Sequence, residues 1–429
     1  MDKLNSLRSV LTQSSREFGL ALGKVLSAAQ PLQSEEFLKG REQQLHGIEK
    51  ALYAPGRHVL IHGLRGVGKS SLAQTAAFKT ARGHDPIIVS CDPSSTFKSI
   101  IKDIFDDASG RDPRVVEVVR KVEVQGGLSF LKGGASSSQT EREIPEPLSV
   151  NDAVRVIHAL SDTMGERPVF VVDEFDLIQS EEVQRDFANL VKQVSDKHIE
   201  ACFIFCGIAE STDALMAAHA SADRYFHAVN LGRLPWEARV EIINGAAEAL
   251  GISVDRNTAL RIAAISDGFP FYVHFISEKL FWAVYEAKNG GLVTPDLFQD
   301  AMAEAASAMD MKLRGPWERA TQKYEEASAA ILYAVADGHE FKKRSSDIFE
   351  GYTGIMKQLD RTPLGRDKFN ARMHRLKQTS SDCILSGTRA GWYEFTEKMI
   401  RGYVRLKADQ AGVFLDPDHP AAVKLMRNE

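Results

Sequence analysis

Short apolar runs alternate with segments of helical periodicity over residues 36–232. The runs fall at 58–62, 86–91, 168–173 and 201–206, and a further strand-like segment covers 227–231. Residues 169–172 and 202–205 are apolar at every position, as expected for strands that are covered on both faces. Strands that alternate with helices in this way predict βαβ units, and therefore an α/β domain with a mainly parallel sheet.

The pattern becomes helical after the last of these strands. Pro235 suits the first turn of a helix. Apolar residues then recur at helical spacing over 237–250, 256–265, 271–287 and 295–308. We expect a small helical lid that follows the sheet domain, with Gly315-Pro316 at its boundary.

A third pattern begins after that boundary. Helices are predicted over 324–336, from 345 to about 350, and over 367–378, where the third helix has one apolar face. An apolar run at 383–385, a turn at Gly387 and the segment 392–395 then suggest a β-ribbon. Three helices followed by a ribbon are typical of a winged helix.

Two segments lie outside these patterns. Residues 1–35 show apolar positions at helical spacing, which indicates a helix packed on the main domain or an arm that binds a partner. Residues 121–147 alternate, turn at Gly126-Gly127 and continue into a small, polar stretch, so we expect a hairpin with a loop inserted in the sheet domain. The expected domains are therefore 1–35, 36–232, 233–315 and 316–429.

Composition adds limits to this picture. The chain has 429 residues, of which 44% are hydrophobic and 26% charged, which is ordinary for a soluble globular protein. Its net charge of −5 predicts no general affinity for nucleic acid, but residues 316–429 hold 19 Lys and Arg against 16 Asp and Glu. Four scattered cysteines and no apolar run of about 18 residues indicate a reduced, cytoplasmic protein without a membrane span.

The most specific motif is Gly63-Leu64-Arg65-Gly66-Val67-Gly68-Lys69-Ser70, directly between a predicted strand and a predicted helix. It fits the phosphate-binding pattern G-x-x-x-x-G-K-[ST]. Gly63, Gly66 and Gly68 let backbone N–H groups approach phosphate oxygens, and the helix start, through Val67 and Ser71, adds its partial positive charge. Lys69 can reach the β- and γ-phosphates of ATP, and the Ser70 hydroxyl can ligate Mg²⁺.

A second motif supplies two carboxylates at the end of a strand. The apolar run 169–172 is followed by Asp173 and Glu174. Asp173 can hold Mg²⁺, and Glu174 can polarise the attacking water. We therefore expect a Mg·ATP site in which Lys69 and Glu174 act catalytically.

Two further segments offer groups that could respond to the γ-phosphate. Glu210 and Ser211 follow the strand predicted at 201–206, where a polar side chain could sense the phosphate or have no such role. Arg224 precedes the strand-like segment 227–231. An arginine there could stabilise γ-phosphate charge on a neighbouring subunit, or could make an ordinary salt bridge.

Together the segments 37–42, 63–70, 173–176 and 207–211 resemble an AAA+ ATPase, in particular the origin-recognition initiators, the transposition-regulator ATPases and the related STAND and archaeal ATPases. The resemblance covers about 37–400. It implies an AAA+ core, a lid and a C-terminal winged helix. It also implies that Gly40-Arg41-Glu42 lies beside adenine, and that Arg224 is the arginine finger of a homo-oligomer.

Two departures from that family affect the expected mechanism. Glu210 stands where initiators usually have a sensor asparagine, and the lid carries Gly268-Phe269-Pro270 where they carry a sensor arginine. The Gly-x-Pro motif resembles STAND switch ATPases, in which the proline contacts the nucleotide, although it is also a common helix start. These departures favour slow hydrolysis and a switch between ATP and ADP states.

The third helix of the C-terminal segment carries many cations. Residues 361–377 contain six basic residues and one acid. The candidate DNA contacts are Arg366, Lys368, Arg372, Arg375 and Lys377. Such a face suits phosphate contacts with the helix in a major groove, but it is also typical of a solvated or protein-docking surface. Three outputs therefore remain open: a DNA-engaging ATPase, a signalling or defence switch with a protein partner, and a nucleotide-binding scaffold without useful hydrolysis.

Overall fold

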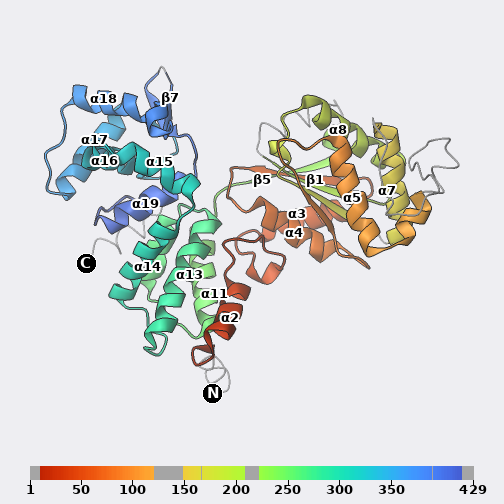
Figure 1. Cartoon of the computed structure of the whole chain (residues 1–429), viewed down its shortest axis with the longest axis horizontal. Coiled ribbons are helices and arrows are strands. Elements are labelled where there is room, and N and C mark those ends of the chain that lie inside the picture. Colours follow the sequence, from red (N-terminus) through yellow and green to blue (C-terminus); the bar gives the residue numbers. More distant parts are fainter. Residues whose placement is uncertain (1–9, 120–147, 166, 208–221, 389, 418–429) are drawn as a thin grey trace, which may run out of the picture. The chain divides into compact units, whose positions relative to one another are not determined.

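The computed structural model describes residues 10–119, 148–165, 167–207, 222–388 and 390–417 (Figure 1). The chain divides into two compact units. The sheet unit comprises Pro31–Leu64 and Gly68–Gly232, and the helical unit comprises Met1–Gln30, Arg65–Val67 and Arg233–Glu429. Each is described by itself below.

The sheet unit is built on five parallel strands in the order β2-β3-β4-β1-β5. The strands are β1 (His58–Gly63), β2 (Ile87–Ser90), β3 (Val169–Asp173), β4 (Cys202–Gly207) and β5 (Phe226–Leu231). They confirm the predicted α/β fold, and β3 and β4 are buried at every position. These strands carry apolar side chains on both faces, so both faces of the sheet must be shielded from solvent.

Helices cover both faces of this sheet. Figure 1 shows α3 (Glu42–Tyr53) and α4 (Lys69–Thr80) on one side, and α5 (Phe97–Arg111), α7 (Val150–Met164) and α8 (Glu181–Asp196) on the other. The core beneath the second group includes the rings of Phe175, Phe187 and Phe205, which meet edge to face with centroids 5.1–5.8 Å apart. The short helices of this unit are Glu35–Phe37, Phe175–Leu177 and α10 (Ala222–Tyr225).

Strand order determines where the loops gather. β1 lies between β4 and β5, so the chain leaves β1 through α4 and crosses two strands to reach β2 at the edge. Such a reversal leaves a crevice at the carboxyl ends of the central strands, which is where ligands bind in open α/β sheets. The loop after β1 and the carboxylates at the end of β3 therefore both lie at the carboxyl ends of the strands.

The helical unit begins with the four predicted lid helices. They are α11 (Trp236–Leu250), α12 (Arg256–Ile265), α13 (Pro270–Ala287) and α14 (Pro295–Ala308). The N-terminal helix α2 (Ser15–Val25) packs on α13, where Phe18 stacks on Tyr285 with ring centroids 4.2 Å apart. The Ser27 amide also donates to His274 Nδ1 at 3.3 Å. This N-terminal segment was expected on the main domain, but its apolar face is buried against the lid.

The C-terminal helices and strands complete this unit. They are α15 (Met311–Thr321), α16 (Glu325–Ala336), β6 (Lys343–Arg344), α17 (Ser345–Gln358), α18 (Arg366–Leu376), the short helix Thr379–Ser381, β7 (Leu385–Gly387), β8 (Trp392–Phe395) and α19 (Ile400–Gln410). The strands form an antiparallel sheet in the order β6-β8-β7. Helices α16–α18 followed by the β7–β8 ribbon have the element order of a winged helix. Gly315 and Pro316, expected at a boundary, lie inside α15.

Some expectations fall outside the described residues. These are the hairpin and loop at 121–147 and the sensor candidates Glu210 and Ser211. Within the described ranges, no helix combines the length and apolar character needed to cross a membrane.

Candidate nucleotide-binding site

The loop after β1 depends on three glycines. Gly63, Gly66 and Gly68 have φ values of 154°, 79° and 95°, a region that side chains rarely adopt. A Cβ atom on Gly63 would also collide with the carbonyl oxygen of Leu231 on the neighbouring strand β5. The sequence G-x-x-x-x-G-K thus produces a loop whose backbone conformation favours glycine at these three positions.

The loop leads directly into the N-terminus of α4. Gly68 is its left-handed N-cap and supplies no side chain to the first N–H groups, which belong to Lys69, Ser70 and Ser71. Val67 is fully buried and anchors the loop beneath them. Lys69 Nζ donates to the carbonyl oxygens of Gly63 at 3.2 Å and Leu64 at 3.1 Å, so its ammonium group lies over the loop. N–H groups at a helix N-terminus that receive no side-chain cap, together with an ammonium group, form an anion-binding arrangement.

Asp173 and Glu174 differ in exposure because the chain turns sharply between them. Asp173 ends β3 and is only 6% exposed, whereas Glu174 is exposed. Glu174 has φ 54°, and its amide donates to Asp173 Oδ1 at 2.9 Å. The next residue, Phe175, is buried among aromatic rings and fixes the turn. The result is one oriented, buried carboxylate for a metal and one exposed carboxylate for water.

Cys206 connects the two motifs, a role that sequence reasoning missed. Its thiol lies on β4, between the strands that carry the P-loop and Asp173, with Sγ 3.9 Å from the carbonyl oxygen of Lys69. Burial, followed by the charge of Asp173, raises the pKa of the Cys206 thiol well above its usual range. The residue was predicted only as a small buried hydrophobe, and its position in the strand next to Asp173 was the available signal.

Cys91 lies on the other side of Asp173. Its amide donates to the Asp173 carbonyl oxygen at 2.9 Å. Burial, then the charge of Asp173, raises the pKa of Cys91 to about 12. Both thiols therefore stay protonated at neutral pH and add no negative charge to the site.

Two residues assigned to the nucleotide have structural partners. The Ser71 hydroxyl accepts from the Leu32 amide at 3.1 Å, so this side chain holds the first residues of the sheet unit. Arg41 is 4% exposed and donates through Nη2 to the Gly232 carbonyl oxygen at 2.6 Å. Burial lowers the pKa of Arg41 to about 10, which leaves it charged at neutral pH.

Arg224 lies at the amino ends of the strands, whereas the P-loop of the same chain lies at their carboxyl ends. β1 and β5 are parallel and in register, with His58 beside Phe226 and Gly63 beside Leu231. Arg224 precedes β5, whereas the P-loop follows β1. Six residues of strand span about 20 Å, so this exposed arginine does not reach the nucleotide site of its own chain.

Pro270 is the first residue of α13, after Phe269 as N-cap. Gly268 precedes them with φ 79°, and a Cβ there would lie 3.0 Å from the Leu234 carbonyl oxygen. The motif thus forms a tight turn and a regular helix start within the lid.

A divalent cation fits the donors present. Ser70 offers a hydroxyl group and Asp173 a carboxylate, the oxygen ligands that Mg²⁺ prefers when phosphate oxygens and water complete its shell. Among the described residues no group of three or more His, Cys, Asp or Glu is arranged to hold a metal unaided. The donor set therefore suits a metal that arrives with a nucleotide.

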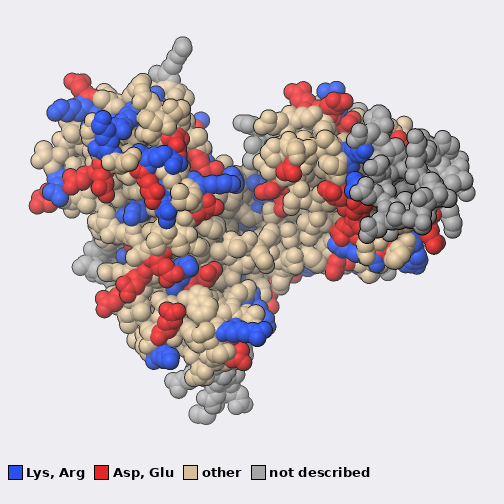
Figure 2. Space-filling view, viewed as in Figure 1, with Lys and Arg blue, Asp and Glu red and all other residues tan. Residues whose placement is uncertain are grey.

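The basic residues of the C-terminal segment gather over α18, as Figure 2 shows. Arg366 and Lys368 are exposed, and Arg372, Arg375 and Lys377 are partly buried. Four of these five cations lie over aromatic rings, at centroid distances of 4.7 Å for Arg366 on Phe349, 3.1 and 5.1 Å for Arg372 and Arg375 on Tyr324, and 5.3 Å for Lys377 on Tyr393. The rings hold the cations in place while guanidinium edges remain able to donate hydrogen bonds.

Comparison with known proteins agrees with this site. Residues 38–204 match the family model described as AAA ATPase domain. The matched range contains the glycine loop, Lys69, Asp173 and Glu174. A search of curated proteins finds no match.

Three solved structures align with 88–90% of this chain at low sequence identity. A Walker-type ATPase of Pyrococcus abyssi is 17% identical, covers 88% of this chain and 98% of its own, and has a TM-score of 0.52. The ORC2 protein of Aeropyrum pernix is 14% identical, covers 90% and 98%, and has a TM-score of 0.48. The RuvB Holliday junction branch migration motor of Thermotoga maritima is 13% identical, covers 89% and 98%, and scores 0.44. At this identity the first likeness shows a shared fold.

Proposed function

Because residues 38–204 form an AAA ATPase domain, we propose that the chain is a nucleotide-operated switch. It binds Mg·ATP, hydrolyses it slowly and passes the nucleotide state to a C-terminal winged helix. The observation that carries this proposal is the glycine loop, whose left-handed residues open onto the uncapped N-terminus of α4 beneath Lys69.

Each site residue has a role in this proposal. The loop amides and Lys69 bind the β- and γ-phosphates and offset their charge. Ser70 and Asp173 hold Mg²⁺, which neutralises charge on the transferred phosphoryl group. Glu174, exposed beside buried Asp173, orients and polarises the attacking water. Arg41 fixes the end of β5 on the adenine side through Gly232.

Slow turnover is part of the proposal. Glu210 stands at the place of a sensor asparagine, and its negative charge opposes that of the γ-phosphate. The Gly268-Phe269-Pro270 turn supplies no cation where initiators carry a sensor arginine. Both features reduce stabilisation of the charge that develops during hydrolysis.

Assembly follows from the location of Arg224. Arg224 lies at the amino ends of the strands and its own P-loop at their carboxyl ends. It is therefore proposed to complete the nucleotide site of a neighbouring subunit. ATP then favours a homo-oligomer, since the γ-phosphate supplies the contact that ADP lacks. An Arg224→Ala variant that assembles with ATP as the wild type does would remove this part of the proposal.

DNA is the output that we favour. Helix α18 presents Lys368, Arg372 and Arg375 on one face, and the Tyr324 ring beneath the two arginines reduces the entropy lost when they bind phosphate. A helix of this kind beside a β-ribbon suits the major groove, with the ribbon near the backbone.

A protein partner is the second candidate, favoured by the same stacking. Arg372 lies 3.1 Å above the Tyr324 ring, and Arg361 pairs with Glu326 at 3.3 Å. Cations already held by their own domain leave a mixed aromatic and basic surface, which suits an acidic protein as well as DNA.

Titration of duplex DNA at several salt concentrations, with ATP and with ADP, tests the proposal. We expect affinity to depend on nucleotide and to fall steeply with salt, and Lys368→Glu to lower both the affinity and the salt slope by about one phosphate contact. Lys357→Glu on α17 makes the same charge change on an exposed side chain away from α18 and serves as the matched control. ATP-dependent assembly without any DNA affinity would instead support the protein partner.

A further inference from the structure

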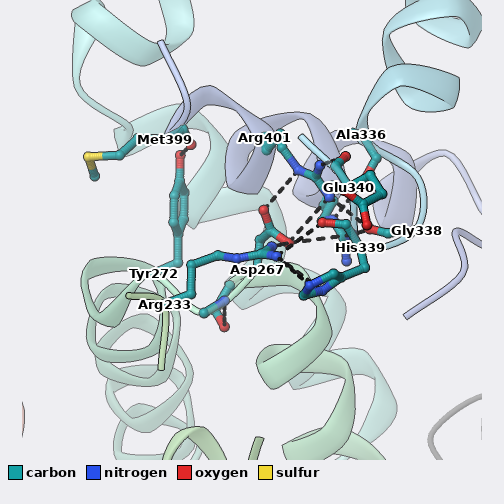
Figure 3. Close-up of polar contacts among 12 residues, drawn as sticks. Arg233, Asp267, Tyr272, Ala336, Gly338, His339, Glu340, Met399 and Arg401 are labelled. Atoms are coloured by element: carbon teal, nitrogen blue, oxygen red, sulfur yellow. Dashed lines mark hydrogen bonds and ion pairs between the residues drawn. The ribbon is translucent and has the colours of Figure 1, made fainter. Parts of the chain in front are cut away.

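A buried ion cluster lies in the helical unit, around the turn between α12 and α13. Asp267 has no exposed surface and pairs with Arg233 at 2.7 Å, Arg401 at 2.8 Å and Arg405 at 3.5 Å (Figure 3). Arg401 and Arg405 belong to α19, and Asp267 directly precedes the Gly268-Phe269-Pro270 turn. One carboxylate thus joins the lid turn to the last helix of the C-terminal segment.

Three guanidinium groups exceed the charge of one carboxylate, and backbone oxygens satisfy the remainder. Arg401 donates to the carbonyl oxygens of Ala336 at 3.2 Å, Gly338 at 2.8 Å and Glu340 at 2.5 Å. Arg405 donates to Ala336 at 3.0 Å and Gly338 at 2.6 Å. These acceptors lie at the C-terminal end of α16, where the helix dipole is negative, so α16 is bound into the same cluster.

Tyr272 provides a second connection between the turn and α19. It lies in the first turn of α13, and its hydroxyl donates to the Met399 carbonyl oxygen at 2.7 Å (Figure 3). Its ring packs where a side chain on Gly402 would stand, so any Cβ there would collide with it. Ion pairs and close packing therefore hold the same two segments by independent means.

One of the chain connections between the two units runs through Gly232 and Arg233, and each of these residues has a partner within its own unit. The Gly232 carbonyl oxygen accepts from Arg41 within the sheet unit, at 2.6 Å. The next residue, Arg233, is held by Asp267 and donates to the His339 carbonyl oxygen at 3.0 Å within the helical unit. Arg233 thus belongs to the same cluster as Asp267 and joins the start of the lid to it.

We propose that the Asp267 cluster and Tyr272 form a clamp through which the turn at Gly268–Pro270 moves α19 and α16 as one body with the lid. The inference rests on the proposed function, in which the nucleotide state is the signal. It adds that α16 and α19 are not hinged separately from the lid, because the clamp joins both of them to the lid turn.

Hydrogen exchange of the full-length protein with ADP and with a non-hydrolysable ATP analogue tests this clamp. In the wild type we expect nucleotide exchange to change amide protection in both the turn at 266–270 and the start of α19. In Asp267→Asn, which keeps the shape but removes the charge, the turn still responds and α19 does not. Coupling of typical strength corresponds to a loss of about 5- to 150-fold in the linked protection.

Asp409→Asn is the matched control. It removes the Arg261–Asp409 ion pair of 3.1 Å, which also joins α12 to α19 but lies away from the turn. This variant is expected to keep both responses. If Asp267→Asn fails to fold, Tyr272→Phe is compared with the wild type in its place. This variant loses one hydrogen bond of the same clamp, and we expect a partial loss of the α19 response.

The possible failures are distinct. A folded Asp267→Asn protein whose α19 responds as in the wild type would overturn the clamp and leave the proposed function standing. A wild-type protein that binds ATP without any response of the turn would contradict the proposed switch, and the clamp with it. Loss of both responses in Asp409→Asn would also count against the clamp, because any lid contact would then suffice.

Discussion

The helical unit contains two groups of arginines whose positive charges are stabilised in different ways. Arg401 and Arg405 are buried, with Asp267 and backbone carbonyl oxygens as acceptors. Arg372 and Arg375 on α18 are partly exposed and lie over the ring of Tyr324. Buried charge must be fully satisfied, because desolvation is costly, whereas a surface cation needs only a ring to hold it.

The two groups therefore have different roles: the buried arginines stabilise the structure, and the arginines of α18 can bind a partner. The buried arginines have no capacity left for a ligand, so their number and position serve the connection between lid and α19. The α18 arginines retain guanidinium edges toward solvent and can exchange water for phosphate or carboxylate. The positions of these arginines in the sequence do not distinguish the two groups, whereas the burial of their side chains does.

Removal of the shared carboxylate gives the largest expected effect. Asp267→Ala leaves two buried guanidinium groups, those of Arg401 and Arg405, and the partly buried one of Arg233 without their counter-ion, and is expected to lower the free energy of unfolding by about 3–5 kcal/mol. Denaturant unfolding, followed by the fluorescence of Trp317 and the other tryptophans, measures this. Arg372→Ala is the comparison at the surface, with an expected loss of about 0.5–1 kcal/mol. Equal losses in the two variants would abolish the distinction.

Packing at α19 gives the next effect. Gly402→Ala forces a methyl group into the Tyr272 ring and is expected to cost about 1–3 kcal/mol. Gly354→Ala on α17 is the matched control, since a Cβ there meets nothing within 4 Å and removal of a helical glycine stabilises by roughly 0.5–1 kcal/mol. Opposite signs in the unfolding free energies support close docking of α13 on α19, and two stabilising changes would refute it.

Lys343 provides a pH test of the excess buried cations. Its ammonium donates to the Ala334 carbonyl oxygen at 3.0 Å, and burial, with Arg401 and Arg405 nearby, lowers its pKa to about 8. The charged form is therefore less favourable in the folded than in the unfolded state, and stability should rise as pH increases above 8 toward the unfolded value. We expect about 1 kcal/mol more stability at pH 9 than at pH 7, referenced to Lys343→Met. A wild-type protein that gains no more than this variant contradicts the shift.

The ring beneath α18 gives the smallest effect. Tyr324→Leu removes the surface under Arg372 and Arg375 and is expected to cost about 0.5–1 kcal/mol of unfolding free energy. If the ring also positions these cations for DNA, affinity falls while the salt slope stays the same, because the charges remain. A reduced salt slope would show that the ring acts by another route.

Local patterns explain how much the sequence could predict. The strands at 58–63 and 202–207 could be predicted because burial of residues 58–61 and of all of 202–207 leaves short apolar runs in the sequence. The P-loop was readable because its glycines, Lys69 and the helix start are consecutive. The lid helices 256–265 and 295–308 agree with the predicted bounds to the residue, since Asp255 and Thr294 cap them.

Long-range contacts explain what the sequence could not predict. Asp267, Arg233 and Arg401 are separated by 34 and 134 positions, and no spacing rule connects them. Arg401 and Arg405, four apart among apolar residues, were the only local signal of a buried polar helix face, and α19 was not predicted. The packing of α2 on the lid was missed for the same reason: Phe18 finds its partners near residue 285.

Equilibrium binding of ATP to the wild type and to Lys69→Ala, with and without Mg²⁺, tests the central claim most directly. The account predicts that the variant folds with unchanged stability and binds about 10- to 100-fold more weakly, as loss of a charged hydrogen bond to phosphate requires. It also predicts that Mg²⁺ strengthens binding in the wild type and not in Asp173→Asn. A folded Lys69→Ala protein that binds Mg·ATP with normal affinity would contradict the account.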